Sequence, residues 1–424
     1  MPRLVQAQRP FASLASFLGS FFSSGERVLF SILVLVHVLP VWAFRYFPTT
    51  DGPAHLYNAW LWKTLALNAS HPFHHYLAFN FQPEPNYLSH VLLAGALTVL
   101  PLWLADKVVL TLHVAGLPVA LRYWLRSWQP AAKFLTVLGL PFVYSMVFSV
   151  RLILAVLLGG LLGYAGWQHL RRQAVAVAGA WAVAIIGLAV AYIWMPDAIA
   201  GGSIVRPRLA LCSYLLVLGL LSTVPYPRRL QQFILGVGGL LAVLLLGFRY
   251  SHYRTLATGI DEYRSAAPYL RPGATLAALT YGNVTHMPNG KTYDSYINPF
   301  PHAAGYLSVE RHLFNFENYE AQTGYFPLVW RPGAALLTDT QGAPAVFDLA
   351  AYPLVRWPDY VLLWGRTTQT VPTANAQVVA AQLARAYQLV YRSPTGLLEL
   401  YARGFSPAGS AAKQPATPQI GPTR

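Results

Sequence analysis

The chain has little charge and a single cysteine, and each shortage excludes a class of protein. Charged residues make up 11% of its 424 residues, whereas soluble domains carry about 25%. The one cysteine, Cys212, lies inside an apolar run. A disulfide framework and a Cys-ligated metal site within one chain are therefore excluded. Hydrophobic residues reach 55%, and this balance indicates a membrane protein.

Acidic residues are the scarcest charge. The chain holds 15 Asp and Glu against 30 Lys and Arg, which gives a net charge of +15. A basic protein of this kind could bind nucleic acid, but here the basic residues form short clusters between apolar runs. That arrangement is typical of topology signals in membrane proteins, so no nucleic-acid partner is expected.

Long apolar runs start after an amphipathic segment at 1–26, which we expect to lie on the cytoplasmic membrane surface. The first run is 28–44. Seven others follow at 88–104, 107–121, 134–150, 152–168, 174–195, 209–224 and 231–248. About 20 apolar residues cross the hydrocarbon core, so most of these runs qualify as membrane spans.

The basic clusters decide which runs cross. The loops at 122–133, 171–172 and 228–229 and the N-terminus are all basic, and the positive-inside rule places all of them in the cytoplasm. An even number of crossings must then separate residue 27 from residue 122, although three runs lie there. We assign 88–104 as a helix lying along the outer surface. The prediction is a polytopic α-helical bundle of about seven crossings plus this juxtamembrane helix, with 45–106, 195–208 and 251–424 outside.

The composition changes after Tyr250, where Pro, Gly, Asn and Asp become common. Residues 27–250 form the predicted transmembrane domain, and 251–403 suit one extracytoplasmic α/β domain. Strands are predicted at 274–281 and 360–364, a helix at 375–388, and two strands on either side of a turn at 394–396. Residues 404–424 are rich in Pro, Ala, Ser and Thr and are expected to be disordered.

The loop that follows the first span carries the chemistry. Asp51, His55, Tyr57 and Asn58 lie within eight residues, and a carboxylate just outside a span indicates a functional site. We predict Asp51 and His55 as catalytic residues and Tyr57 and Asn58 as substrate ligands. Other roles remain open for each of them. Asp51 is followed by Gly and Pro, which is also typical of a helix N-cap. His55 could be a hydrogen-bonded interfacial histidine, and Tyr57 and Asn58 could belong to an aromatic belt.

Most carboxylates of the first 250 residues fall on the predicted outer face, which suggests that they surround one outward cleft. They are Asp51, Glu84, Asp106 and Asp197. Asp197 is thus a candidate substrate ligand, although an acid after proline also fits a simple turn.

A first span, an outer loop that opens with an acid, a surface-lying helix, a late basic outer loop and an outer C-terminal domain together resemble the GT-C superfamily of membrane glycosyltransferases. That superfamily includes the protein O-mannosyltransferases and the lipid A aminoarabinose transferase. The resemblance covers residues 27–250 as a layout and suggests a shortened member. It implies that Asp51 activates an acceptor hydroxyl and that Arg206, Arg208 and Arg151 hold the phosphate of a lipid-linked donor.

Metal binding is left open, and no ligand set is assigned. Two weak groupings exist, one at His71, His74 and His75 and the other at His302, Glu310 and His312. The segment 317–320, with the sequence Glu-Asn-Tyr-Glu, could meet an acceptor, but solvated loop residues are the simpler interpretation.

The resemblance implies a glycosyltransferase of the bacterial inner membrane. Its partners would be a polyprenyl-phosphate-linked sugar donor, membrane lipids and an envelope glycan, lipid or protein as acceptor. The alternative is a catalytically inactive multi-pass protein that anchors an extracytoplasmic binding domain.

Overall fold

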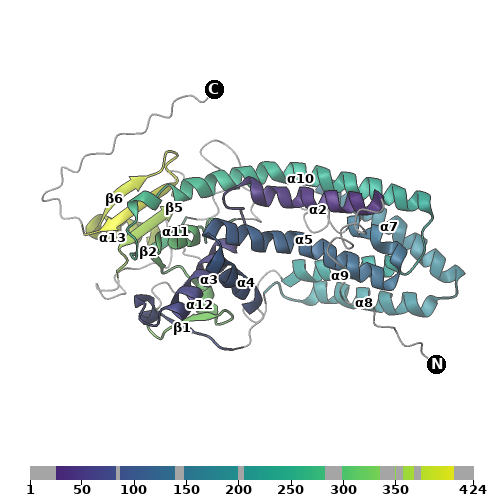
Figure 1. Ribbon diagram of the computed structural model, residues 1–424, viewed down its shortest axis with the longest axis horizontal. Helices are drawn as coiled ribbons and strands as arrows, with labels where there is room; N and C mark the ends of the chain where they lie inside the picture. The colour runs from purple at the N-terminus through teal and green to yellow at the C-terminus, as the bar shows by residue number, and fades with distance from the viewer. Residues whose placement is uncertain are drawn as a thin grey trace, which may run out of the picture.

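Long helices packed side by side give the molecule an elongated shape (Figure 1). The computed structural model describes residues 25–82, 86–138, 148–198, 205–281, 298–334, 349, 357–366 and 374–404. Within these residues, six helices are long and apolar enough to cross a membrane. They are α2 (Gly25–Ala43), α5 (Leu102–Trp128), α7 (Phe148–Arg171), α8 (Val175–Trp194), α9 (Val205–Ser222) and α10 (Arg228–Arg264). The chain is a multi-pass membrane protein. Most of the predicted segments 1–26 and 404–424 lie outside the described residues.

The surface of α8 shows what surrounds the bundle. None of its residues is buried, and Val183 and Ile186 are 73% and 60% exposed. A large apolar surface of this kind is rare on a soluble monomer. In hydrocarbon it is favourable, because a helix satisfies its backbone polar groups internally. The bundle therefore presents a lipid-facing surface.

Basic loops meet at one end of the bundle. Glu26, at the start of α2, pairs with Arg122 at 2.5 Å and with Lys133 at 3.8 Å. The ring of Phe134 packs on Tyr226, with centroids 5.4 Å apart, and so joins the loop after α5 to the loop before α10. We call this the basic end. The charge pattern correctly placed these two loops together.

The predicted span 134–150 is described only at its two ends. A 3₁₀ helix, η2 (Pro130–Leu135), leads from α5 back into the bundle, where Val137 packs in one cluster with Leu33 of α2 and Ala242 of α10. Residues 139–147 lie outside the described range. The chain thus enters the bundle at the beginning of this run.

The run 88–104 is not one continuous helix. Helix α4 (Tyr87–Val99) ends before Pro101, and α5 begins at Leu102. Asp106, which the prediction placed at the end of the outer segment 45–106, and Lys107 therefore lie inside α5, where both are buried. Helix α4 is too short to count among the candidate spans. The correction has a local cause, because proline starts a helix well but does not continue one.

Helix α10 joins the bundle to the C-terminal part of the chain. Its 37 residues span roughly 55 Å at 1.5 Å per residue. Leu240 and Leu244 are exposed in its first half, whereas Leu256 and Ile260 are buried in its second. The composition change at residue 250 therefore lies within a single helix that leaves the lipid and enters a protein core.

A five-stranded sheet forms the C-terminal domain. Its strand order is β3-β2-β5-β7-β6, with β2 parallel to β3 and β5, and β7 antiparallel to β5 and β6. The strands are β2 (Thr275–Thr280), β3 (Phe314–Asn315), β5 (Tyr360–Trp364), β6 (Tyr387–Arg392) and β7 (Leu398–Arg403). Helix α13 (Ala374–Ala386) packs on β6. The predicted strands and this helix are confirmed, because each is set by a local apolar pattern.

The loop after α2 and the C-terminal domain share one core. Helix α3 (Gly52–Leu67) packs against α4, α11 (Ala304–Arg311) and α12 (Tyr319–Thr323). Strand β1 (Leu77–Phe79) pairs with β4 (Leu328–Trp330). Leu56 and Leu61 are fully buried in the same cluster as Tyr306 and Phe314. We call this region, built from residues 45–106 and 298–334, the junction.

Candidate functional site

Asp51 stands at the N-terminus of α3, within the junction. It occupies the N-cap position, and Pro53 lies in the first turn, as the sequence predicts. Its carbonyl accepts the first helical hydrogen bond from His55 N at 3.0 Å. Its carboxylate makes no capping bond and is 51% exposed. Capping therefore does not use the acid group, which remains available for chemistry.

Two glycines fix the position of Asp51. A Cβ atom at Gly52 would lie 2.0 Å from Thr49 Oγ1, and one at Gly305 would lie 2.2 Å from the Pro53 carbonyl oxygen. Helix α11 thus packs backbone against backbone on the first turn of α3. Only glycine permits this approach, because any side chain at residue 305 would push the two helices apart.

The approach of α11 brings His302 to Asp51. His302 Nε2 lies 3.9 Å from Asp51 Oδ1, and its Nδ1 donates a 2.8 Å hydrogen bond to Glu317 Oε1. Both His302 and Glu317 are buried, and the ring of Tyr319 covers His302 at 4.4 Å. Burial disfavours the imidazolium, but the charge and hydrogen bond of Glu317, aided by Asp51, outweigh it and raise the pKa of His302.

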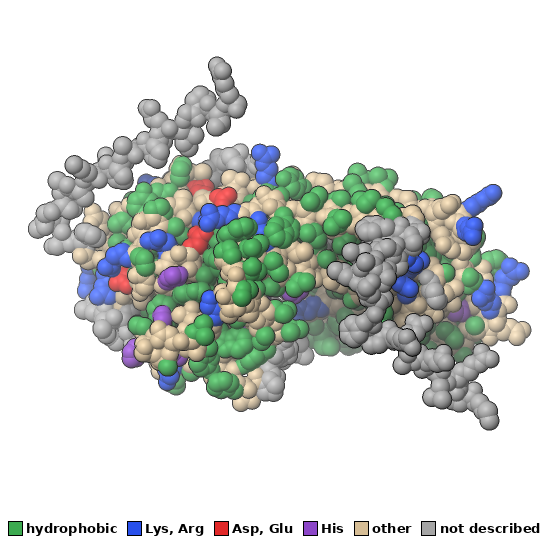
Figure 2. All heavy atoms as spheres, viewed as in Figure 1, with side chains coloured by type: hydrophobic (Ala, Val, Ile, Leu, Met, Phe, Trp, Pro, Cys, Tyr) green, Lys and Arg blue, Asp and Glu red, His purple; other side chains and the backbone are tan. Residues whose placement is uncertain are grey.

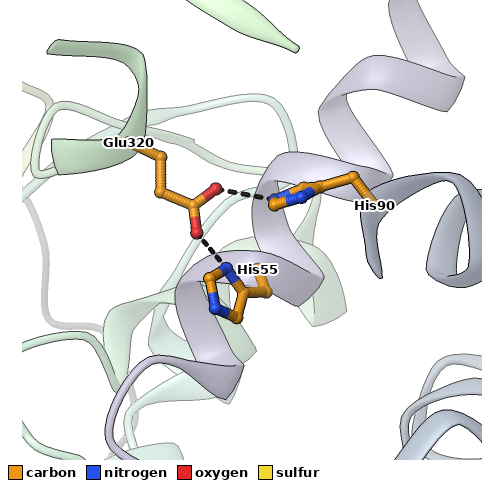
Figure 3. A group of neighbouring side chains, drawn as sticks. All are labelled: His55, His90 and Glu320. Carbon is orange, nitrogen blue, oxygen red and sulfur yellow. Dashed lines mark hydrogen bonds and ion pairs between the residues drawn. The ribbon is translucent and has the colours of Figure 1, made fainter. Parts of the chain in front are cut away.

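A second buried acid lies beside this group. Glu320 has no exposed side-chain surface and receives hydrogen bonds from His55 Nδ1, from His90 Nε2 at 2.9 Å and from Asn58 Nδ2 at 2.6 Å (Figure 3). Burial alone would raise the pKa of Glu320. The charges and hydrogen bonds of His55 and His90 outweigh burial and lower that pKa to about 2.

The solvated interpretation of segment 317–320 is wrong. Glu317, Asn318 and Glu320 are all buried. Buried carboxylates require partners, and here the partners are His302 for Glu317 and the His55 and His90 side chains for Glu320. His90 and His55, the partners of Glu320, come from helices 230 and 265 residues earlier in the chain.

Tyr57 and Asn58, predicted as substrate ligands, are fully enclosed. The Tyr57 hydroxyl accepts from Asn315 N at 2.8 Å and lies 3.3 Å from the Leu313 carbonyl, to which it donates. Asn58 donates to Glu320. Their described hydrogen bonds hold the two halves of the junction together.

The predicted phosphate ligands lie elsewhere in the chain. Arg206 N donates to Asp197 Oδ1 at 3.1 Å, and Arg206 Nε donates to the Met195 carbonyl at 3.0 Å. Asp197 and Arg206 thus close the loop between α8 and α9, in line with the turn interpretation of Asp197. Arg208 is exposed on α9. Arg151 is in the first turn of α7, and its side chain lies outside the described part, as does Glu84.

An open cavity of about 550 Å³ lies where α4 gives way to α5. Arg45, Lys63 and Arg311 line it, with Glu310 as the acid among its lining residues. Its other walls are apolar or aromatic and include Trp60, Leu97, Leu100, Leu102 and Trp103. Figure 2 shows acidic, basic and histidine side chains gathered at the sheet end of the molecule. Cations and aromatic rings beside the start of a span suit an anionic, membrane-borne ligand.

The two weak metal groupings noted in the sequence do not form ion-binding clusters among the described residues. His74 Nε2 bonds the carbonyls of Leu65 and Asn68, and Glu310 pairs with Arg264. The described residues that lie close enough to share an ion are His55, His90 and Glu320. The sequence analysis named His55 as a candidate site residue and considered Glu320 only as a contact to the acceptor of the sugar. It missed His90 as a site residue, because a histidine in an apolar run gives no sign of its partner.

Fold and site together define a multi-pass membrane protein with a polar junction between its bundle and a C-terminal sheet domain. No family model, no curated protein and no solved structure matches the chain.

Proposed function

We propose that this protein is a glycosyltransferase of the bacterial inner membrane. It moves a sugar from a polyprenyl-phosphate donor to a cell-envelope acceptor on the outer face. The cavity at the start of α5 is the observation that carries this proposal. It combines three basic side chains with an apolar wall next to a lipid-facing bundle, which is the pairing that a phosphate on a long lipid requires.

In this proposal Arg45, Lys63 and Arg311 hold the donor phosphate, and the apolar wall receives the first part of the lipid. Arginine and lysine bind phosphate through charge-assisted hydrogen bonds. These residues replace Arg206 and Arg208 as the phosphate ligands. Arg45 precedes Asp51 by six residues, so the cavity wall and the acid are at most about 20 Å apart along the chain.

Asp51 is the base of the reaction. Its carboxylate takes the proton of the acceptor hydroxyl as that oxygen bonds to the anomeric carbon of the sugar. The bond from that carbon to the phosphate oxygen breaks, and the lipid phosphate leaves with the electron pair. His302, held by Glu317, lies beside Asp51, with its Nε2 atom 3.9 Å from Asp51 Oδ1.

The test is donor turnover in proteoliposomes that contain the full chain. A panel of polyprenyl-phosphate sugars is supplied with envelope extract, and release of polyprenyl phosphate is measured. We expect release by the wild type and a loss of at least about 100-fold in Asp51→Asn, the scale of a general base. Asp197→Asn is the control and should keep wild-type turnover. Equal turnover in Asp51→Asn, or none in the wild type with any donor, would favour the inactive anchor.

A further inference from the structure

Three potential ligands meet in the junction from three different helices. His55 belongs to α3, His90 to α4 and Glu320 to α12. Their ligand atoms all lie within 4.8 Å of one another, and Figure 3 shows both imidazole rings directed at the one carboxylate. His90 and Glu320 are fully buried. A group this close and this enclosed can surround an ion.

The surroundings of His90 suit a metal ligand. His90 Nδ1 lies 2.9 Å from the Asn86 carbonyl oxygen and 3.4 Å from the Ser89 hydroxyl, and His90 Nε2 lies 2.9 Å from Glu320 Oε2. An Nδ1–H bonded to a backbone carbonyl is the usual arrangement of a metal-bound histidine, whose Nε2 lone pair faces the ion.

Asn58 supplies a second, independent observation. Its side chain is fully buried, and its Oδ1 atom has no hydrogen-bond partner among the described residues. Burying an amide oxygen without a partner is costly. Asn58 lies three residues after His55, on the same face of α3, and its amide reaches Glu320 Oε2 at 2.6 Å. A rotation of this amide beside an ion in the cluster would give the oxygen a partner.

We propose that His55, His90 and Glu320 bind a divalent transition-metal ion of the zinc class, with Asn58 Oδ1 as a fourth ligand. Two imidazoles favour zinc and its neighbours over Mg²⁺ and Ca²⁺, which take oxygen ligands. Bonds of about 2.0–2.2 Å to a tetrahedral ion would place the ligand atoms roughly 3.4 Å apart. His90 Nε2 and Glu320 Oε2, now 2.9 Å apart, would separate by about half an ångström when the ion enters, and His55 Nδ1 would move away from Glu320 by about an ångström.

The ion would act by positioning. It would join α3 and α4, which follow the first span, to α12 of the C-terminal domain. His55 is one helical turn from Asp51, so the same bond would hold the start of α3 against His302. This inference does not rest on the proposed sugar transfer, since it concerns only how the junction is held.

The experiment measures metal in the purified full-length protein, prepared in detergent with an affinity tag that contains no histidine. Elemental analysis should find a single equivalent of zinc. Removal with EDTA should lower the thermal unfolding temperature, and added Zn²⁺ should restore it in a saturable way. Co²⁺ in place of zinc should give the visible absorption of a tetrahedral site. A protein that holds no zinc, gains no stability from Zn²⁺ or Co²⁺ and ignores EDTA would overturn the proposal and leave a buried His–Glu–His ion cluster.

Variants separate metal binding from folding. His90→Gln keeps a similar shape and should lose at least about 90% of the zinc, whereas the matched control His74→Gln should keep it. If His90→Gln does not fold, His55→Gln, at a less buried ligand, takes its place. Zinc retained by a folded ligand variant at the wild-type level, or lost from the control, would equally contradict the assignment.

Discussion

The bundle and the junction satisfy their polar side chains in different ways. In the bundle several bonds are local: Ser31 donates to the Arg27 carbonyl, and His113 bonds the Val109 carbonyl, each four residues back. Others join neighbouring helices, as where Arg122 pairs with Glu26, 96 residues earlier. In the junction Glu320 is held by side chains 230 to 265 residues away. The bundle thus combines bonds within a helix with bonds between helices, whereas the buried acid of the junction depends on two distant parts of the chain. Four substitutions test this contrast.

The largest effect is expected from Gly305→Val, which places a side chain where the backbones of α11 and α3 come closest together. The new side chain would overlap the Pro53 carbonyl, and overpacking of this kind costs about 3 kcal/mol. Thermal unfolding in detergent should show the loss. Gly236→Ala is the matched control, because nothing lies within 4 Å of its Cβ position. If both variants unfold alike, the backbone contact between α3 and α11 is not what fixes the junction.

Glu26→Gln removes the carboxylate charge at the basic end of the bundle. Arg122 would lose the carboxylate that it contacts at 2.5 Å, and leaving a largely buried charge without its partner costs about 2 kcal/mol or more. Unfolding should become easier. Binding of polyprenyl phosphate to the remaining folded protein should not change, because the cavity is at the other end. Weaker binding in the folded fraction would show that the two regions are coupled.

Removing one cation from the cavity should affect binding more than stability. Arg45→Ala should weaken polyprenyl phosphate binding roughly tenfold, the scale of one charge-assisted hydrogen bond. Native mass spectrometry or a filter-binding assay with that lipid would measure it. Arg208→Ala is the control and should bind as the wild type does. If Arg208→Ala weakens binding and Arg45→Ala does not, the phosphate site is the loop between α8 and α9.

The smallest effect concerns pH. Because the pKa of His302 is raised in the fold, its stabilising contribution is complete below the unfolded value near 6.5 and disappears as pH rises through the folded value. Wild type should therefore exceed His302→Asn in unfolding free energy most clearly near pH 6 and by less at higher pH. His71→Asn, at the edge of the junction, is the control. A difference that grows with pH would mean that burial outweighs Glu317 and keeps His302 neutral in the fold.

The bundle and the sheet were largely predictable because their signals are local. Apolar runs gave the described spans, and strand β5 was predicted at 360–364, where it is found. The change in composition after Tyr250 did not reveal that one helix continues across it. The composition changes after Tyr250, but no proline interrupts residues 228–264, so α10 continues.

The site was only partly predictable. Asp51 could be recognised because it follows a span directly, and its N-cap position follows from the Gly and Pro after it. Glu317 and Glu320 resembled solvated loop residues, since no neighbour in sequence explains their burial. Their partners are brought to them by the packing of α11 on α3, and a contact that depends on Gly305 is not visible as a pattern.

The most direct test of the central claim is to locate the lipid phosphate. A polyprenyl-phosphate analogue with a photoreactive group near the phosphate is cross-linked to the full chain in proteoliposomes, and labelled peptides are sequenced. We predict labels at the start of α5, around Leu100 and Trp103, that diminish in Arg45→Ala. Labels on the loop at 195–208, or labelling that an excess of unmodified polyprenyl phosphate does not reduce, would contradict a donor site at the junction.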